Sequence, residues 1–95
     1  MYYKQFSLSN GIRCVYVSKR DLSISCINIT FKVGSKNESS DNLGISHLLE
    51  HMFFKGTKKN PSSIDITSRI ESLGGYINAH TGLDTTTYEI KIATK

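Results

Sequence analysis

The chain has 95 residues, of which 38% are hydrophobic, and it carries a formal net charge of +4. This length allows one domain at most, and no apolar run approaches the roughly 18 residues that a membrane-spanning helix needs. The basic residues are scattered, without interleaved aromatic residues, which disfavours nucleic-acid binding and favours an ordinary solvated surface. Two cysteines, Cys14 and Cys26, are too few for a disulfide scaffold and are expected to be reduced thiols in the core.

The first third of the chain predicts three strands. It opens with an alternating pattern and without the basic segment and apolar run of a signal peptide, which predicts an intracellular protein. Residues 3–9 and 12–18 flank Asn10-Gly11, a pair typical of a tight β-hairpin turn because both positions tolerate a positive φ. Residues 24–33 alternate apolar and polar side chains, which predicts a half-buried strand.

Two helices are predicted next. The first spans residues 43–55 and follows a loop rich in turn-forming residues, so that Asp41 and Asn42 are its candidate N-terminal caps. The second spans about residues 62–73, and Pro61 leads into it as a residue that is tolerated at the first position of a helix, where a missing N–H is harmless. The first helix is largely apolar and is expected to be buried, with its few polar side chains facing a cavity.

The last third predicts two further strands, at residues 75–80 and 85–93, and the second of these alternates clearly. The order strand, strand, strand, helix, helix, strand, strand is typical of an α+β fold. We therefore expect a largely antiparallel sheet with two helices packed on it.

Three polar residues interrupt the apolar helix within the segment "GISHLLEHMFFKGT". At about 100° per residue, His47, Glu50 and His51 project from one face, within an arc of roughly 100°. Two histidines one turn apart are well placed to bind zinc, and a glutamate beside them can act as a base on a metal-bound water. The order His-x-x-Glu-His is that of the inverted zinc peptidases. The alternative is that these are core or surface residues whose polar groups are hydrogen-bonded and that bind no metal.

The sequence around this motif resembles the N-terminal part of the pitrilysin and insulinase family of zinc metallopeptidases. The blocks "LSNGIRCVYV", "ITFKVGSKNESSDNLGISH", "GISHLLEHMFFKGT" and "IESLGGYINAHTGLDTTTYEIKI" follow one another as they do in that family. The resemblance extends most closely to the mitochondrial processing peptidase β-subunit and to bacterial processing proteases. It implies that residues 1–95 are an incomplete N-terminal part of a larger peptidase domain.

The resemblance also implies roles for individual residues. His47 and His51 would bind Zn²⁺, and Glu50 would be the general base that activates a zinc-bound water for the hydrolysis of peptide bonds. Phe54 matches a position of the family's pocket for the residue after the scissile bond, with plain core packing as the alternative. Asn78 and Ala79 match the edge strand on which an extended peptide docks.

Asn78 and His80 also have interpretations that involve no site role. Without the resemblance, Asn78 would be interpreted as a strand or turn residue that bonds its own backbone. His80 stands where the family varies and is expected at the surface or at the edge of a cleft, without binding the metal.

The family's third zinc ligand, a glutamate on a later helix, has no counterpart in this chain. Four carboxylates follow the motif, and none matches the context of that ligand, although Glu71 matches a different family position; they are Asp65, Glu71, Asp84 and Glu89. With two protein ligands, zinc would be bound weakly, and water or a neighbouring chain would complete the tetrahedron. We therefore expect the 95-residue chain to be inactive alone.

Two hypotheses follow. In the first, the chain is the N-terminal part of a zinc endopeptidase that acts on peptides or proteins and needs a missing C-terminal part or a partner subunit. In the second, it is a non-catalytic fragment, or a peptide-binding or self-associating module. Exposed sheet edges predict a dimer, with strand exchange as one possible form. The bacterial cytoplasm is the expected location, with the mitochondrial matrix as the alternative.

Overall fold

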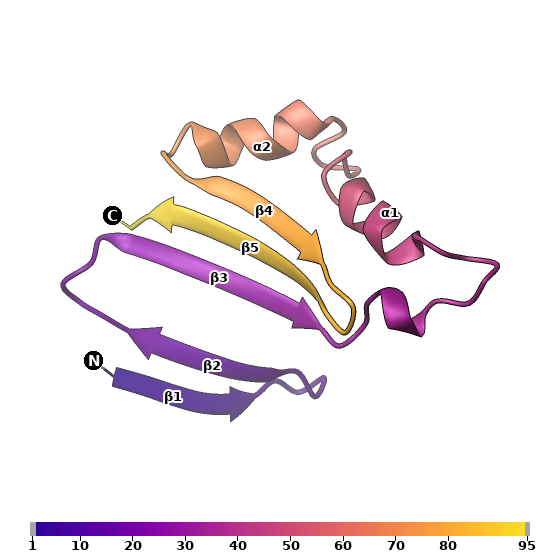
Figure 1. Cartoon of the computed structure of the whole chain (residues 1–95). Helices are drawn as coiled ribbons and strands as arrows, with labels where there is room; N and C mark the ends of the chain where they lie inside the picture. Colours follow the sequence, from indigo (N-terminus) through magenta and orange to yellow (C-terminus); the bar gives the residue numbers. More distant parts are fainter. Residues whose placement is uncertain (1, 95) are drawn as a thin grey trace.

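The computed structural model describes residues 2–94 and has five strands and two α-helices (Figure 1). Their order confirms the α+β class that the sequence predicts. A short 3₁₀ helix, η1, precedes the first α-helix. The elements are β1 (Tyr2–Ser7), β2 (Arg13–Ser18), β3 (Ile24–Phe31), η1 (Ser35–Asn37), α1 (Ile45–Met52), α2 (Ser63–Glu71), β4 (Tyr76–Thr81) and β5 (Thr86–Ala93).

The strands form two antiparallel sheets rather than the single sheet expected from the sequence. β1 pairs with β2, and a separate three-stranded sheet has the order β3-β5-β4. In Figure 1, α2 runs alongside β4 and α1 lies beyond the far end of that strand, so both helices belong to the β4 side of the molecule. Among residues 2–94, neither α-helix combines the length and apolar character that crossing a bilayer requires.

The first hairpin turns over three residues, not two. The backbone N–H of Leu8 donates to the carbonyl of Ile12, and the N–H of Gly11 donates back to Leu8. Gly11 has a φ of 89°, whereas Asn10 has a negative φ. This is the geometry of a type I turn followed by a left-handed residue, in which only the glycine position needs a positive φ.

The three-stranded sheet has one apolar and one polar face. Ile29 lies opposite Tyr88 and Ile27 opposite Ile90, so their side chains share a face. Asn28 lies opposite Glu89, and both belong to the other face. The ring of Phe53 lies 4.8 Å from that of Tyr88 and packs the end of α1 against the apolar face.

The core expected for a small domain is incomplete. No hydrophobic side chain among residues 2–94 is fully buried, and Ile27 remains 60% exposed. The expectation that α1 is buried is wrong, because its apolar residues, such as Leu48 at 57%, are largely exposed. The cysteines are free, but Cys14 is half-buried and Cys26 exposed, so they are not core residues. Exposed apolar area of this extent is unusual for a complete domain.

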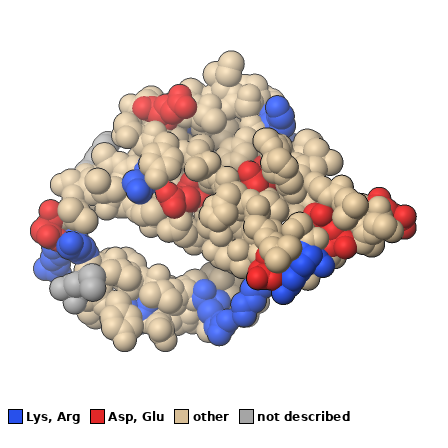
Figure 2. Space-filling view, viewed as in Figure 1, with Lys and Arg blue, Asp and Glu red and all other residues tan. Residues whose placement is uncertain are grey.

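A cleft separates the hairpin β1-β2 from the rest of the molecule (Figure 2). β2 and β3 run in opposite directions and face each other in Figure 1, yet they do not pair, so each leaves one edge free. The cleft has a volume of about 780 Å³ and is lined by both elements, including Phe6, Val15 and Ile29. On the face shown in Figure 2, basic side chains lie in several separate places rather than in one patch.

The second helix begins differently from the prediction. Pro61 precedes it, and Ser62 is the N-cap, whose hydroxyl accepts a hydrogen bond from the N–H of Asp65 while the Asp65 carboxylate accepts one from the N–H of Ser62. This reciprocal capping box satisfies two N–H groups that the first helical turn leaves free. Pro61 therefore lies outside α2 rather than at its first position.

Candidate metal centre and its supports

The candidate metal centre lies on α1, and the start of this helix is held by a residue that the sequence did not single out. The predicted caps are wrong: the N-cap is Gly44, which has a φ of 85° and no side chain, and Asn42 instead accepts hydrogen bonds from Ser39. The carboxylate of Glu38 accepts the N–H of Gly44 and the N–H of Ser46, each at 2.8 Å. These bonds lower the pKa of Glu38, the Ser46 N–H contributing most.

The three motif residues of α1 come together as the sequence predicts. The Nε2 atoms of His47 and His51 lie 2.9 Å apart, and one ligand atom from each of His47, Glu50 and His51 lies within 4.8 Å of the others. Both histidines are exposed, whereas Glu50 is only 9% exposed. Within residues 2–94 this is the only group of three or more metal-binding side chains that converges.

This donor set fits a zinc ion. Two nitrogen ligands at about 2.0 to 2.1 Å on a tetrahedral zinc lie roughly 3.3 Å apart, so the Nε2 atoms need to open only slightly. A hydrogen bond between the two imidazoles would also give the observed separation, and then one ring would donate to the other. Both imidazole rings are exposed to solvent, so a metal ion can reach them. In this they differ from two histidines that are hydrogen-bonded inside a core.

Glu50 is held from the sheet. The hydroxyl of Thr81, at the end of β4, donates a 2.5 Å hydrogen bond to Oε2 of Glu50. Burial raises the pKa of Tyr88, and the nearby Glu50 carboxylate raises it further. An apolar pocket of about 300 Å³ adjoins this region, between α1 and the ends of β3 and β5, and is lined by Leu49, Phe53 and Tyr88 among others. Glu50 is thus the inward-facing member of the group, on the side away from solvent.

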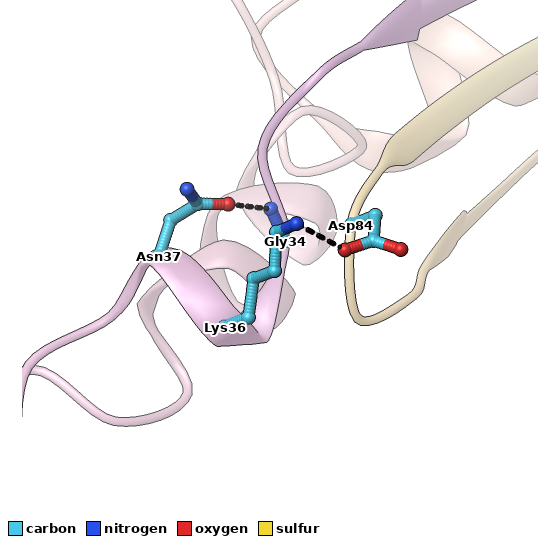
Figure 3. Close-up of polar contacts among 4 residues, drawn as sticks. All are labelled: Gly34, Lys36, Asn37 and Asp84. Carbon is cyan, nitrogen blue, oxygen red and sulfur yellow. Dashed lines mark hydrogen bonds and ion pairs between the residues drawn. The ribbon is translucent and has the colours of Figure 1, made fainter.

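The segment before α1 is joined to the turn between β4 and β5 (Figure 3). The backbone N–H groups of Ser35 and Lys36 donate to the carbonyls of Gly82 and Leu83, both at 3.1 Å. The ammonium group of Lys36 also lies 2.6 Å from the carboxylate of Asp84, although this pair is exposed and contributes little by itself. Because Gly82 follows Thr81 directly, one turn supports both the approach to α1 and the carboxylate of Glu50.

Of the other predicted site residues, Phe54 lies near Tyr88 of β5, and Asn78 and Ala79 lie on the edge strand β4. Phe54 is half-buried, with its ring centroid 6.5 Å from that of Tyr88. Asn78 and Ala79 lie on β4, which pairs only with β5 and is therefore an edge strand. His80 is exposed on β4 and does not join the group around His47.

The edge of β4 carries one feature that bears on peptide docking. The N–H of Gly82 donates to the carbonyl of Thr85 across the turn between β4 and β5. Residues of an antiparallel strand point their N–H groups alternately toward and away from the neighbouring strand. Ala79, three residues before Gly82, therefore points its N–H away from β5. That N–H is bonded to Oδ1 of Asn78 at 2.9 Å. The side chain of Asn78 thus occupies the donor that an added strand would use.

The four downstream carboxylates have other partners or positions. Asp65 caps α2, Asp84 pairs with Lys36, and Glu89 accepts a 2.7 Å hydrogen bond from the hydroxyl of Tyr76. Glu71 is the last residue of α2. Among the described residues, none of the four joins His47, Glu50 and His51, so none supplies the third ligand.

Sequence reasoning missed Glu38 and Thr81. Glu38 lies eight residues before Ser46 in a loop without periodicity, and Thr81 lies 31 residues after Glu50. Capping motifs are recognised at a spacing of about three residues, so neither contact has a local sequence signal.

Comparisons with known proteins agree on one family. Residues 13–95 match the sequence profile of insulinase (peptidase family M16). The chain is 38% identical over 86 residues to the mitochondrial-processing peptidase subunit beta of Dictyostelium discoideum, covering 90% of this chain and 18% of that protein. It is 36% identical over 89 residues to the uncharacterized zinc protease YmxG of Bacillus subtilis, covering 94% of this chain and 22% of that protein.

A solved structure is also similar. The crystal structure of a protease from Helicobacter pylori superposes with a TM-score of 0.87 at 33% sequence identity, covering 97% of this chain and 22% of that one. The chain therefore spans about a fifth of the length of the proteins that it matches.

Proposed function

Because this chain belongs to the insulinase family of peptidases, peptidase family M16, we propose that it is the N-terminal part of a zinc-dependent metalloendopeptidase. The observation that carries this proposal is the convergence of three potential ligand atoms, from His47, Glu50 and His51, within 4.8 Å on one short helix. The names of relatives from bacteria and from mitochondria, a zinc protease and a processing peptidase subunit, agree with it.

His47 and His51 would hold the metal through their exposed imidazoles, and Glu50 would act as the general base. A bound zinc ion supplies a Lewis acid that polarises a water molecule and a peptide carbonyl. Glu50 would take a proton from the attacking water and pass it to the leaving amine, as a general base and then a general acid. Its burial and its bond from Thr81 hold one carboxylate oxygen and leave the other available for this transfer.

The third metal ligand must come from outside the described residues. Two imidazoles alone leave a tetrahedral site half open, so the chain would bind zinc weakly and would not hydrolyse peptides by itself. We propose that the missing ligand comes from a C-terminal part or from a partner subunit.

Substrates are proposed to be peptides or proteins that dock in an extended form beside β4. Phe54 would contribute to the pocket for the residue after the scissile bond. Asn78 and Ala79 would offer the strand edge, on condition that the Asn78 side chain releases the Ala79 N–H to the substrate backbone. The proposed location is intracellular, in the bacterial cytoplasm or, alternatively, in the mitochondrial matrix.

Metal content tests the centre. Zinc bound per chain after equilibrium dialysis should fall sharply in His47→Ala and in His51→Ala, because each change removes half of the protein ligands. His80→Ala is the matched control, since it removes an exposed histidine outside the group. Equal zinc in the parent and in both motif variants would rule the centre out.

The alternative function, a non-catalytic fragment that binds peptides or self-associates, is favoured by one observation. β2 and β3 each leave an edge free beside a cleft of about 780 Å³, and unpaired edges with exposed apolar side chains attract further strands. Sedimentation velocity should then show a dimer, with strand exchange as one possible form. A compact monomer at high concentration would argue against self-association and leave the metal centre unaffected.

A further inference from the structure

The helix that carries the motif lacks the usual means of defining its own start. α1 has eight residues and its N-cap is a glycine without a side-chain hydrogen bond. Isolated helices of this length are marginal in water, because nucleation orders several residues for few bonds. The first turn of α1 therefore depends on contacts from outside the helix.

Glu38 makes the side-chain contacts that hold this turn. Its two carboxylate oxygens accept the N–H groups of Gly44 and Ser46, so one side chain satisfies two N–H groups at the helix start. A carboxylate is also favoured there by the partial positive charge of the helix N-terminus. The lowered pKa of Glu38 keeps the group ionised well below neutral pH.

We propose that Glu38 is a positioning residue for the metal centre: by holding the first turn of α1, it keeps His47 within reach of the ion that His51 also binds. This inference rests on the proposed zinc site. His47 is the third residue of α1 and follows Ser46 directly, whereas His51 lies one turn further along. Fraying of the first turn would therefore displace His47 before His51 and leave a single imidazole ligand.

The position of Glu38 is itself fixed by the sheet. Its N–H donates to the carbonyl of Ser35, whose own N–H donates to Gly82 in the turn between β4 and β5. The same turn begins beside Thr81, which holds Glu50. Glu38 therefore connects the histidine-bearing turn of α1 to the element that orients the proposed base, and the three motif residues share one support.

The test compares Glu38→Gln with Asn42→Ala in the same chain. Glutamine keeps the shape of the side chain but has one acceptor oxygen and no charge. Asn42 accepts bonds from Ser39 in the same loop through its side chain, so its replacement loosens the loop without removing an acceptor from the N–H groups of Gly44 or Ser46. We expect Glu38→Gln to weaken zinc binding about tenfold, a loss typical of outer partners of metal ligands.

Two readouts separate positioning from a general loss of stability. If Glu38→Gln and Asn42→Ala unfold at the same urea concentration, Glu38→Gln should still bind zinc more weakly than Asn42→Ala. Glu38→Asp, which keeps the charge on a shorter side chain, should recover part of the affinity for zinc. Amide hydrogen exchange of Gly44 and Ser46 without metal should be faster in Glu38→Gln than in the parent.

The outcomes distinguish this inference from the proposed function. If the parent binds zinc and Glu38→Gln binds it equally well, or if affinity merely follows the urea midpoint in every variant, the positioning role is overturned while the centre stands. If the parent binds no zinc, the centre fails and the inference fails with it. Unchanged exchange at Gly44 and Ser46 would also overturn it, whatever the zinc result.

Discussion

The hydroxyl of Thr81 donates a hydrogen bond to the buried carboxylate of Glu50, joining the end of β4 to the motif helix across 31 residues of sequence. Glu50 is the only charged residue among residues 2–94 that is buried. A buried carboxylate needs a hydrogen-bond donor, because leaving it unpaired is costly. This contact therefore sets the orientation of the proposed base and makes the end of β4 part of the site.

Replacing Thr81 by valine should destabilise the chain by about 1 to 3 kcal/mol, because valine has a similar shape but leaves Glu50 without its donor. The measurement is the free energy of unfolding in urea. Thr81→Ser keeps the hydroxyl and should retain most of the stability. Full stability in Thr81→Val together with a loss in Thr81→Ser would show that the methyl group, not the hydrogen bond, stabilises this contact.

Glu50→Gln should keep the metal and lose hydrolysis. The amide oxygen can still accept the Thr81 hydroxyl, so the fold is preserved, but the group can no longer take a proton from water. In a longer protein that contains the third ligand, peptide turnover should fall by about 10²- to 10⁴-fold, the range for removal of a general base. Zinc content and a fluorogenic peptide assay measure the two effects, and full turnover in the variant would assign the base elsewhere.

The Glu38 contact should depend on pH with a defined sign. Its folded-state pKa is lowered, so its contribution to stability is complete above the ordinary carboxyl pKa and is lost as the pH falls through the lowered value. The free energy of unfolding should therefore differ most between the parent and Glu38→Gln near neutral pH. This difference should shrink as the pH falls from the ordinary carboxyl pKa through the lowered one. A difference that stays constant over this range would exclude an ionised cap.

Gly34→Ala should disrupt the joint between the loop before α1 and the turn between β4 and β5. Gly34 is extended, with a φ of −155°, so the effect is one of space rather than of backbone conformation. An added Cβ would lie closer than 3.0 Å to the backbone oxygens of Gly82 and Leu83, which belong to the turn. Overpacking of this kind costs about 1 to 3 kcal/mol.

Gly82→Ala is the control for this joint, because a Cβ there meets its nearest atom at 3.5 Å, an ordinary contact. Urea unfolding of the two variants gives the comparison. Since the loop leads to Glu38, Gly34→Ala should also weaken zinc binding, whereas Gly82→Ala should not. Similar unfolding midpoints in both variants would contradict the close approach of Gly34 to the turn.

Local patterns in the sequence were sufficient for the strands, the helices and the converging motif. Alternation along β3 and β5 requires only that side chains of a strand point to opposite faces, and the positions of His47, Glu50 and His51 need only the pitch of a helix. Hence the α+β class and the convergence of the three residues were predictable. The boundaries were less predictable: α1 begins after Gly44 and α2 after Ser62, instead of at Asn42 and Pro61. The start of α1 is held by the more distant Glu38, whereas the capping box of Ser62 and Asp65 is a local pattern that sequence reasoning missed.

By itself, then, the sequence determined which residues share a face and which family the chain belongs to, because both depend on short-range spacing and on the order of motifs. Only the tertiary structure decided that the strands form two sheets, that Glu50 is buried while the histidines are exposed, and that Glu38 and Thr81 hold the motif from two sides. The physical reason is that these features come from contacts between segments far apart in the chain. Such contacts leave no period in the sequence, since each depends on where other segments lie when the chain is folded.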